Sequence, residues 1–219
     1  CIRDRYEGGR ILKLDKEGKL QTLSGNGKKG YAGDGLLADK GMYSSMHNLA
    51  WASNNFLYIS DTHNNLVRKI NGNINRLSTL AGTPNQKGFS GDNGPAEKAK
   101  LDTPISISLT PDEKTLLIAD IRNRRIRAVD LNSGIIRTIA GNGKKGKPID
   151  GKLTLEQPLI DPRAAIMDEA GNLFVLERSG NALRVVHPDG KIYTLAGTGK
   201  KGQRDGPALQ ATFNGPKHL

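Results

Sequence analysis

Short apolar runs alternate with clusters of turn-forming residues along almost the whole chain. Between residues 104 and 141 the apolar runs read PISISLT, TLLIAD, RIRAVD and IIRTIAG, and the turn segments PDEK and NSG separate members of this series. Runs of this length that are rich in Ile, Val and Leu are typical of β-strands, whereas Pro, Asp, Asn and Gly favour tight turns. The pattern predicts a four-stranded antiparallel meander.

The same pattern recurs at a regular interval. A stretch of apolar, threonine and apolar residues precedes a glycine or proline loop at Thr22, Thr79, Thr138 and Thr194, so that the intervals are 57, 59 and 56 residues. This period is about the length of one blade of a β-propeller. One small sheet cannot bury both of its faces, but sheets stacked around an axis bury them against each other. The repeat therefore predicts an all-β propeller built from four-stranded antiparallel blades.

Acidic and basic residues keep the same register. Aspartates beside glycine follow each loop, at Asp34, Asp92, Asp150 and Asp205. A second acid and an arginine recur later in the unit, as Asp61 with Arg68, Asp120 with Arg127, and Glu177 with Arg184. The first group is interpreted as turn caps, because Asp side chains bond the backbone two residues further on. The second group predicts a structural contact, in which Asp120 meets Arg127 or the turn at 121–124.

A glycine pattern associated with nucleotide binding occurs three times. GNGKKG stands at 25–30 and 141–146, and GTGKKG at 197–202. A dinucleotide site needs a helix directly after the glycines, because the helix N-terminus holds the pyrophosphate. The segments that follow are interrupted by Gly and Asp and show no long amphipathic run. We therefore interpret the glycine loops as connectors between blades, with glycines in positive-φ conformations.

The repeated unit resembles the NHL-repeat β-propellers, and the resemblance covers nearly the whole chain. Two copies carry a D-x-x-N-x-x-[VI]-R core: Asp61, Asn64, Val67 and Arg68, then Asp120, Asn123, Ile126 and Arg127. The fourth unit departs from this core, with Glu177, Gly180 and Leu183 before Arg184, and the first has an apparent two-residue insertion between Asp4 and Lys13. The resemblance implies an arc of a larger ring that usually has six blades. A four-bladed ring completed by residues 213–219 is the alternative.

The repeat predicts the division of the chain. Residues 1–41 are expected to form a partial blade, 42–100, 101–158 and 159–212 one blade each, and 213–219 the start of another.

The chain is strongly basic, with a formal net charge of +11. Because equivalent connectors share a face, the lysines of the glycine loops are expected on one rim: Lys28, Lys29, Lys144, Lys145, Lys200 and Lys201. Arg124 and Arg125, in RNRRIR at 122–127, add a second basic cluster. Such a rim could bind RNA through its phosphates, or could consist of solvated charges that keep the protein soluble. Aromatic residues make up only 5% of the chain, so few rings are available for base stacking.

Two histidines are weak candidates for a metal site. His47 and His218 each lie five residues after an aligned apolar residue, Met42 or Phe213, where an inner strand would enter the central channel. The matching positions in the other units are Ser106 and Ala164. A catalytic zinc usually has three protein ligands, so the sequence predicts no metal site and no cofactor.

The propeller is a scaffold with many uses, so function rests on weaker grounds than fold. The favoured hypothesis for the function is a non-enzymatic module that binds protein or another macromolecule. RNA binding through the basic rim is one alternative. A propeller enzyme, a lyase or a lactonase-like hydrolase with a metal in the channel, is another. The sequence contains no run of eighteen apolar residues, so it predicts no membrane-spanning helix.

Overall fold

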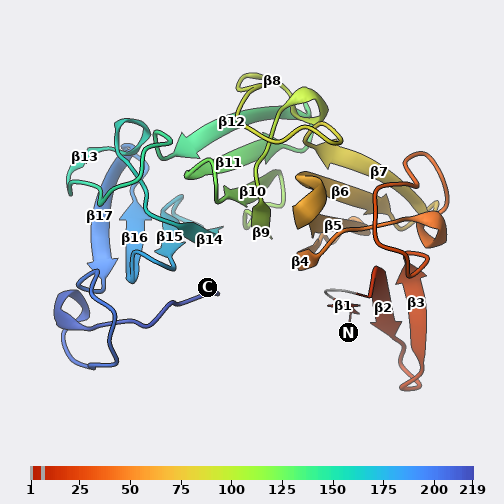
Figure 1. Ribbon diagram of the computed structural model, residues 1–219, viewed down its shortest axis with the longest axis horizontal. Helices are drawn as coiled ribbons and strands as arrows, with labels where there is room; N and C mark the ends of the chain where they lie inside the picture. The colour runs from red at the N-terminus through yellow and green to blue at the C-terminus, as the bar shows by residue number, and fades with distance from the viewer. Residues whose placement is uncertain (1, 6–7) are drawn as a thin grey trace.

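The computed structural model describes residues 2–5 and 8–219, and these form an all-β arc of separate sheets (Figure 1). The first sheet contains β1 (Ile2–Arg5), β2 (Arg10–Leu14) and β3 (Leu20–Ser24). The second contains β4 (Met46–Trp51), β5 (Phe56–Asp61), β6 (Leu66–Asn71) and β7 (Arg76–Ala81). The third contains β9 (Pro104–Leu109), β10 (Thr115–Asp120), β11 (Arg125–Asp130) and β12 (Ile135–Ala140). The fourth contains β14 (Pro162–Met167), β15 (Leu173–Glu177), β16 (Ala182–Val186) and β17 (Lys191–Ala196).

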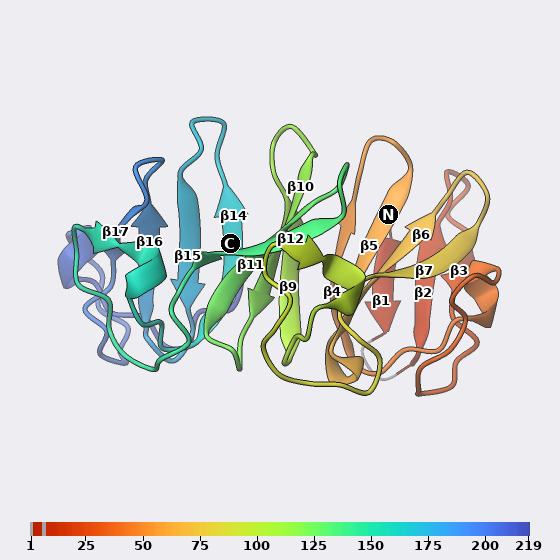
Figure 2. The same cartoon turned by 90° about the horizontal axis from the view of Figure 1, so that it is seen from above.

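Within each sheet the strands pair in chain order and antiparallel, as the alternation of runs and turns predicts. The strands β4, β9 and β14 lie on the concave side of the arc, where β9 contacts both β4 and β14, and β3, β7, β12 and β17 lie on its outer side (Figure 1). The sheets stand side by side like the staves of a barrel when seen from above (Figure 2). The predicted all-β fold with four-stranded sheets is confirmed, whereas the blade boundaries and the size of a complete ring stay predictions.

Alternating side chains of the strands fill the spaces between sheets. On β10, Leu116 and Ile118 pack toward the second sheet, and Leu117 and Ala119 pack toward the fourth. This is the period of two that a strand imposes on its side chains. Because both faces of β10 are covered, its run TLLIAD is apolar almost throughout rather than alternating with polar residues.

Each glycine loop leaves an outer strand, and the loops after β3, β7 and β12 lead into connectors that run along the next sheet. The short strands β8 (Gly94–Pro95) and β13 (Lys152–Leu153) pair with β12 and β17, the outer strands of the sheets that follow them in the chain. The connectors then form single 3₁₀ turns, η1 (Ala38–Lys40), η3 (Ala96–Lys98), η4 (Thr154–Glu156) and η5 (Ala208–Gln210). Another 3₁₀ turn, η2 (Thr62–Asn64), follows β5. The described residues contain no α-helix, and none of their helices is long and apolar enough to span a membrane.

The glycine that opens each connector fits where no side chain could. Gly141 has a φ of 86°, and a Cβ there would lie 2.3 Å from the carbonyl oxygen of Arg124. Gly25, Gly82 and Gly197 have φ values of 92°, 94° and 92° and the same close approach to a backbone carbonyl. The interpretation of the glycine loops as connectors with positive φ is therefore confirmed.

The second and third sheets each contain a buried arginine that bonds the connector running along that sheet. The third sheet shows the arrangement. Arg127 has no solvent exposure, and its guanidinium bonds Asp92 of the connector at 2.8 Å. It approaches Asp120 of its own sheet less closely, at 3.5 Å. The Thr138 hydroxyl donates to the other oxygen of Asp92 at 2.7 Å. The ring of Phe89 covers the guanidinium, with its centre 4.9 Å from Arg127 Cζ.

The second sheet repeats this arrangement with its own residues. Arg68 bonds Asp34 at 2.5 Å and Asp61 at 3.4 Å, and Tyr31 covers the guanidinium. Asp34 and Asp92 thus bind the arginine and threonine of the sheet that their connector runs along. Their interpretation as caps of their own turns is wrong, because the side chains reach across the connector rather than back to the local backbone. The predicted contact of Asp120 with Arg127 is confirmed, and Asp120 also accepts a bond from Asn123 at 2.8 Å.

The fourth sheet also neutralises a buried arginine, Arg184, but with different residues. Glu177 is one methylene longer than aspartate, and its Oε2 accepts from both Nε and Nη2 of Arg184 at 2.8 Å. Gly180 stands where the second and third sheets have asparagine, and a Cβ there would lie 2.7 Å from Cβ of Glu177 and 3.0 Å from its Oε2. The longer acid therefore needs the smaller neighbour. Among the described residues, the Asp150 side chain bonds Thr194 alone, accepting at 2.9 Å from both its hydroxyl and its backbone N–H.

The first sheet lacks the arginine, and its register differs from the one expected. Thr22 pairs with Leu12, whereas Thr79 pairs with Arg68 in the second sheet, so Leu12 and not Lys13 holds the arginine position. Arg5 pairs with Arg10 as Asp61 pairs with Leu66, so Arg5 rather than Asp4 holds the position of the acid. The spacing between the two positions matches the other sheets, and the predicted two-residue insertion is wrong.

Burial and charge divide the acids of this cluster into two kinds. Burial raises the pKa of Asp120 to about 7 and that of Asp61 to about 6, against the opposing bonds from Asn123 or Asn64, backbone N–H groups and the arginine. Partial burial also acts on Asp34, but the Thr79 hydroxyl and the Arg68 guanidinium together hold its pKa below the usual range. Asp34 of the connector lies closer to the Arg68 guanidinium than Asp61 does, and it therefore provides most of the negative charge that neutralises this arginine.

We expect aspartate at position 120 to lose its advantage over asparagine as the pH rises. Because burial raises the pKa of Asp120 from 3.8 to about 7, the folded state retains a proton that the unfolded state has already released. The free energy of unfolding of the parent should therefore fall, relative to Asp120→Asn, by on the order of 1 to 3 kcal/mol between about pH 4 and about pH 7. Urea unfolding of both proteins across this range measures the difference. An advantage of aspartate that grows with pH would show that Arg127 outweighs burial.

The acid and its neighbour in the fourth sheet should be energetically coupled. Glu177→Asp leaves Nε of Arg184 without its partner, and Gly180→Asn places atoms against Glu177, so each change should cost about 1 to 3 kcal/mol. The double variant restores the combination found in the second and third sheets and should cost at least about 1 kcal/mol less than the sum. The matched control is the reverse exchange in the third sheet, Asp120→Glu with Asn123→Gly. Additive costs in denaturant unfolding would contradict the coupling.

Candidate functional site on the connector face

The connectors and the turns between the two middle strands of each sheet form one face of the arc, called here the connector face. It consists of the loops at 25–30, 82–88, 141–146 and 197–202 and the turns at 62–65, 121–124 and 178–181. Side-chain bonds join the two sets, because Asn64 donates to the carbonyl of Gly30 at 2.7 Å and Asn123 to that of Gly88 at 2.6 Å. The hairpin turns that join the other strands lie at the opposite edge (Figure 2).

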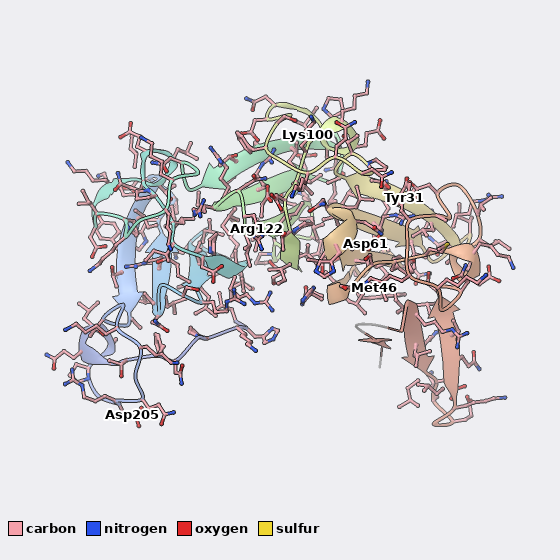
Figure 3. All side chains as sticks on the ribbon, in the orientation of Figure 1. Tyr31, Met46, Asp61, Lys100, Arg122 and Asp205 are labelled. Atoms are coloured by element: carbon pink, nitrogen blue, oxygen red, sulfur yellow. The ribbon has the colours of Figure 1, made fainter. Side chains whose placement is uncertain are left out.

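A hollow of about 470 Å³ opens on this face at the concave side of the arc, and we call it the axial hollow. It lies where the second, third and fourth sheets meet. Its walls are His47, Thr62, His63, Thr103, Ile105, Ile121, Arg122, Arg124, Lys145, Ile160, Asp161, Arg178 and Ser179. His63, Arg122 and Ser179 hold the same position in their respective repeats, two residues after the buried acid, so the repeat itself brings them together. Arg122 lies on the inner side of the arc (Figure 3).

The axial hollow is strongly basic. Its walls carry Arg122, Arg124, Lys145 and Arg178, and the acid among them is Asp161. Asp161 is already committed, because it accepts from Nε of Arg178 at 2.9 Å and from the Ser179 hydroxyl at 2.7 Å. The remaining cations keep a positive potential in a concave surface, which favours an anionic ligand.

Arg124 adopts a backbone conformation that is costly for arginine. Its φ is 50°, in the left-handed region, and the same turn position is asparagine in the second and fourth sheets, with φ of 57° at Asn65 and 44° at Asn181, and Gly9 in the first. Asparagine tolerates this region better than other residues with a side chain. In those sheets it also bonds the next repeat, since Asn65 accepts from the N–H of Thr103 at 2.9 Å. Arginine at this position gives up that contact and places a cation at the axial hollow, and strained residues of this kind cluster at functional sites.

His47 lies at the inner wall in a constrained environment. Its Nδ1 lies 3.0 Å from the Thr62 hydroxyl and 3.1 Å from the carbonyl of Ser45, and its ring centre lies 6.5 Å from that of His63. Burial, together with Arg163 and His63, lowers the pKa of His47 below its ordinary value. The uncharged imidazole is therefore favoured at neutral pH.

The proposed equivalence of His47 and His218 is wrong by one position. Met46, Pro104 and Pro162 pair with the repeated acids, so that His47 corresponds to Ile105 and Arg163 rather than to Ser106 and Ala164. At the C-terminal end, Lys201 bridges Phe213 as Lys29 bridges Tyr43, which makes Lys217 the counterpart of His47. The misalignment arose because Tyr43, and not Met42, is the buried apolar residue of that unit. Within residues 2–5 and 8–219, no three His, Cys, Asp or Glu side chains lie close enough to hold a metal ion.

The structure gives the predicted basic residues different surroundings. All six lysines of the glycine loops, Lys28, Lys29, Lys144, Lys145, Lys200 and Lys201, are exposed, but of these only Lys145 lines the axial hollow. Arg125 points away from it, lies 3.7 Å above the ring of Phe89 and donates to the carbonyl of Asn142 at 2.8 Å. Sequence reasoning missed Arg122, Arg178 and His63 as members of one site. Their common position in the repeat is the signal that would have found them.

Comparison with known proteins finds relatives with propeller repeats. No protein-family profile matches the chain. The chloroplastic protein SUPPRESSOR OF QUENCHING 1 of Arabidopsis thaliana is 28% identical over 92% of this chain and 20% of its own length. NHL repeat-containing protein 2 of Gallus gallus is 25% identical over 86% of this chain and 27% of its own length, and human teneurin-4 is 30% identical over 66% and 6%. The chain thus spans at most about a quarter of these relatives.

Solved structures share the fold. A Bacteroides thetaiotaomicron protein of unknown function superposes with a TM-score of 0.69 at 20% identity, over 97% of this chain and 49% of its own. A chain in the nidogen/laminin complex gives 0.55 at 16%, over 87% and 59%. A gluconolactonase of Xanthomonas campestris gives 0.57 at 16%, over 97% and 60%. Together with the repeated acid, asparagine and arginine and the meander sheets, these similarities identify the chain as a member of the NHL-repeat β-propeller family.

Proposed function

We propose that this chain is a non-catalytic binding module that receives an acidic segment of a partner protein on its connector face. The observation that carries the proposal is the axial hollow, where cations from successive repeats converge around one acid that is already paired. A carboxylate entering the hollow would meet guanidinium groups, which bind carboxylates through two parallel bonds.

Arg124 supports a functional reading of these charges. A solvated cation that serves only solubility could stand at any exposed position, without strain. This arginine instead stands at a left-handed position that is asparagine in the second and fourth sheets and glycine in the first, and its Nε is buried without a hydrogen-bond partner among the described residues. Its backbone conformation costs stability that a ligand contact would justify.

An acidic protein fits the hollow better than RNA does. The hollow is local, whereas the lysine pairs of the glycine loops are distributed over separate connectors. Its walls contain no Phe, Tyr or Trp, and proteins that bind single-stranded nucleic acid usually stack bases on such rings. Among proteins of similar fold, the nidogen/laminin complex is an example of a propeller-containing assembly of proteins.

Enzymes also occur among the structural neighbours, including virginiamycin B lyase of Staphylococcus aureus and the gluconolactonase. Their identities to this chain are 18% and 16%, a level at which the likeness concerns the fold. No grouping of side chains in the axial hollow supports the lyase or lactonase alternative more than it supports binding.

Arg124→Asn should separate binding from stability. The change installs the residue that the second and fourth sheets use, so the melting temperature should stay equal or rise, while binding of an acidic peptide should weaken about fivefold, as expected for the loss of one ion pair worth about 1 kcal/mol. The double variant Arg122→Gln, Arg124→Asn should weaken it further. The measurement is fluorescence anisotropy with a labelled peptide of alternating Glu and Gly, at low and at physiological salt.

The matched control is Lys19→Gln, which removes one positive charge from an exposed position of the first sheet, away from the hollow. Equal losses in the control and in Arg124→Asn would mean unspecific attraction to a basic protein and would contradict the proposal. Single-stranded RNA serves as the second ligand and should bind weakly, with a steep dependence on salt. Tight RNA binding that survives physiological salt and disappears when Lys28, Lys29, Lys200 and Lys201 become glutamine would instead establish the RNA-binding alternative.

A further inference from the structure

A second hollow, of about 600 Å³, lies between the third and fourth sheets, away from the connector face turns that line the axial hollow. We call it the wedge hollow. Its walls are mainly apolar and include Leu117, Ile139, Met167, Leu173 and Val186. Leu153 and Leu155 of the preceding connector line it as well and are about half exposed, at 48% and 54%.

The repeat supplies an internal comparison, because the second and third sheets enclose an equivalent space. There the rings of Phe56 and Tyr58 stack with centres 6.4 Å apart and pack with the core between the sheets. What remains open is about 330 Å³ and is lined by charged residues such as Lys69, Asp112 and Glu113. The same space thus measures about 330 Å³ beside the two aromatic side chains in one wedge and about 600 Å³ in the next.

Residue by residue, the wedge hollow results from smaller side chains at equivalent positions. Thr115 and Leu117 of β10 stand where β5 has Phe56 and Tyr58. Both Thr115 and Leu117 line the wedge hollow. In the packed core between the same sheets, Ala165 of β14 stands where β9 has Ile107, and Val175 stands where β10 has Ile118. The smaller side chains at 115 and 117 thus leave more room in this wedge than its neighbour has.

The cation that lines the wedge changes its position between the two spaces. Lys69 lines the space between the second and third sheets, whereas Ala128 stands at its position in the wedge hollow. Arg137 lines it and is exposed, where the second sheet has Ser78 at the equivalent position of the outer strand. Glu156 lies in the same wall, and no ion pair joins it to Arg137 in the described part of the chain. The Thr154 hydroxyl, also in the wall, is buried and has no hydrogen-bond partner among residues 2–5 and 8–219.

We propose that the wedge hollow is a binding site for a small aromatic carboxylate. The aromatic body would occupy the space that Phe56 and Tyr58 fill in the neighbouring wedge, and the carboxylate would pair with Arg137 at the mouth. Pockets of this volume with apolar walls and a few polar groups are the usual form of small-molecule sites. The site is separate from the axial hollow, so its occupation does not depend on the protein partner proposed above.

The probe is 2-naphthoate, with 2-naphthol and octanoate as comparison ligands, measured by isothermal titration calorimetry and saturation-transfer NMR. 2-Naphthoate should bind saturably. Arg137→Ser, which restores the residue of the second sheet, should weaken naphthoate about fivefold and leave naphthol unchanged. Octanoate should bind more weakly than naphthoate, because a flexible chain loses more conformational entropy on binding than a rigid ring system does.

The decisive variant refills the wedge with the residues of its neighbour. Thr115→Phe with Leu117→Tyr should lower naphthoate affinity at least about tenfold while the melting temperature stays equal or rises. Thr115→Phe alone provides a second, smaller filling in case the double variant does not fold. Leu20→Tyr adds a ring at an exposed position of β3 and should leave binding unchanged. Failure of naphthoate to saturate, unchanged affinity in a folded refilled variant, or tighter binding of octanoate would each overturn the proposal.

Discussion

The structure depends on a buried arginine whose charge is neutralised from two directions. One acid comes from the sheet of the arginine itself and the other from the connector that runs along that sheet, as Asp120 and Asp92 show around Arg127. A guanidinium does not lose its proton in a protein, so the folded state cannot avoid this charge by titration. In the second and third sheets the connector therefore supplies part of the charge that allows the centre of the sheet to be buried. This couples each of these two sheets to the chain segment that precedes it.

The same requirement explains why the repeat tolerates one substitution only together with another. In the fourth sheet Glu177 brings the carboxylate closer to Arg184 and satisfies its Nε, an atom that lacks a partner in Arg68 and Arg127. The connector acid is then released from the arginine, and Asp150 bonds only a threonine. Removal of one member of a buried pair costs far more than replacement of the whole arrangement. The repeats therefore differ by exchanging the acid, its neighbour and the bonds of the connector acid together rather than one at a time.

Much of the fold could be predicted because its signals are residues close together in the sequence and a regular repeat of them. Strand and turn residues give the sheets, the period gives the repeat, and the glycines give the connectors with their positive φ. The partners of Asp34 could not be predicted, since they lie on strands more than thirty residues further along the chain. The assignment of His218 failed for a related reason. Burial identifies Tyr43 as the landmark of its unit, and sequence letters alone do not separate it from Met42.

The candidate sites emerge where the repeat departs from itself. Shared features such as the buried arginine maintain the architecture, and their regularity is what makes the departures visible. Arg124 replaces an asparagine that suits its backbone, and Thr115 with Leu117 replace two rings that would fill a wedge. The first exchange places arginine in a left-handed backbone conformation, and the second leaves a larger hollow between two sheets. A repeat protein thus contains its own reference state, and residues that break the pattern at a cost in stability are the ones for which function supplies the reason.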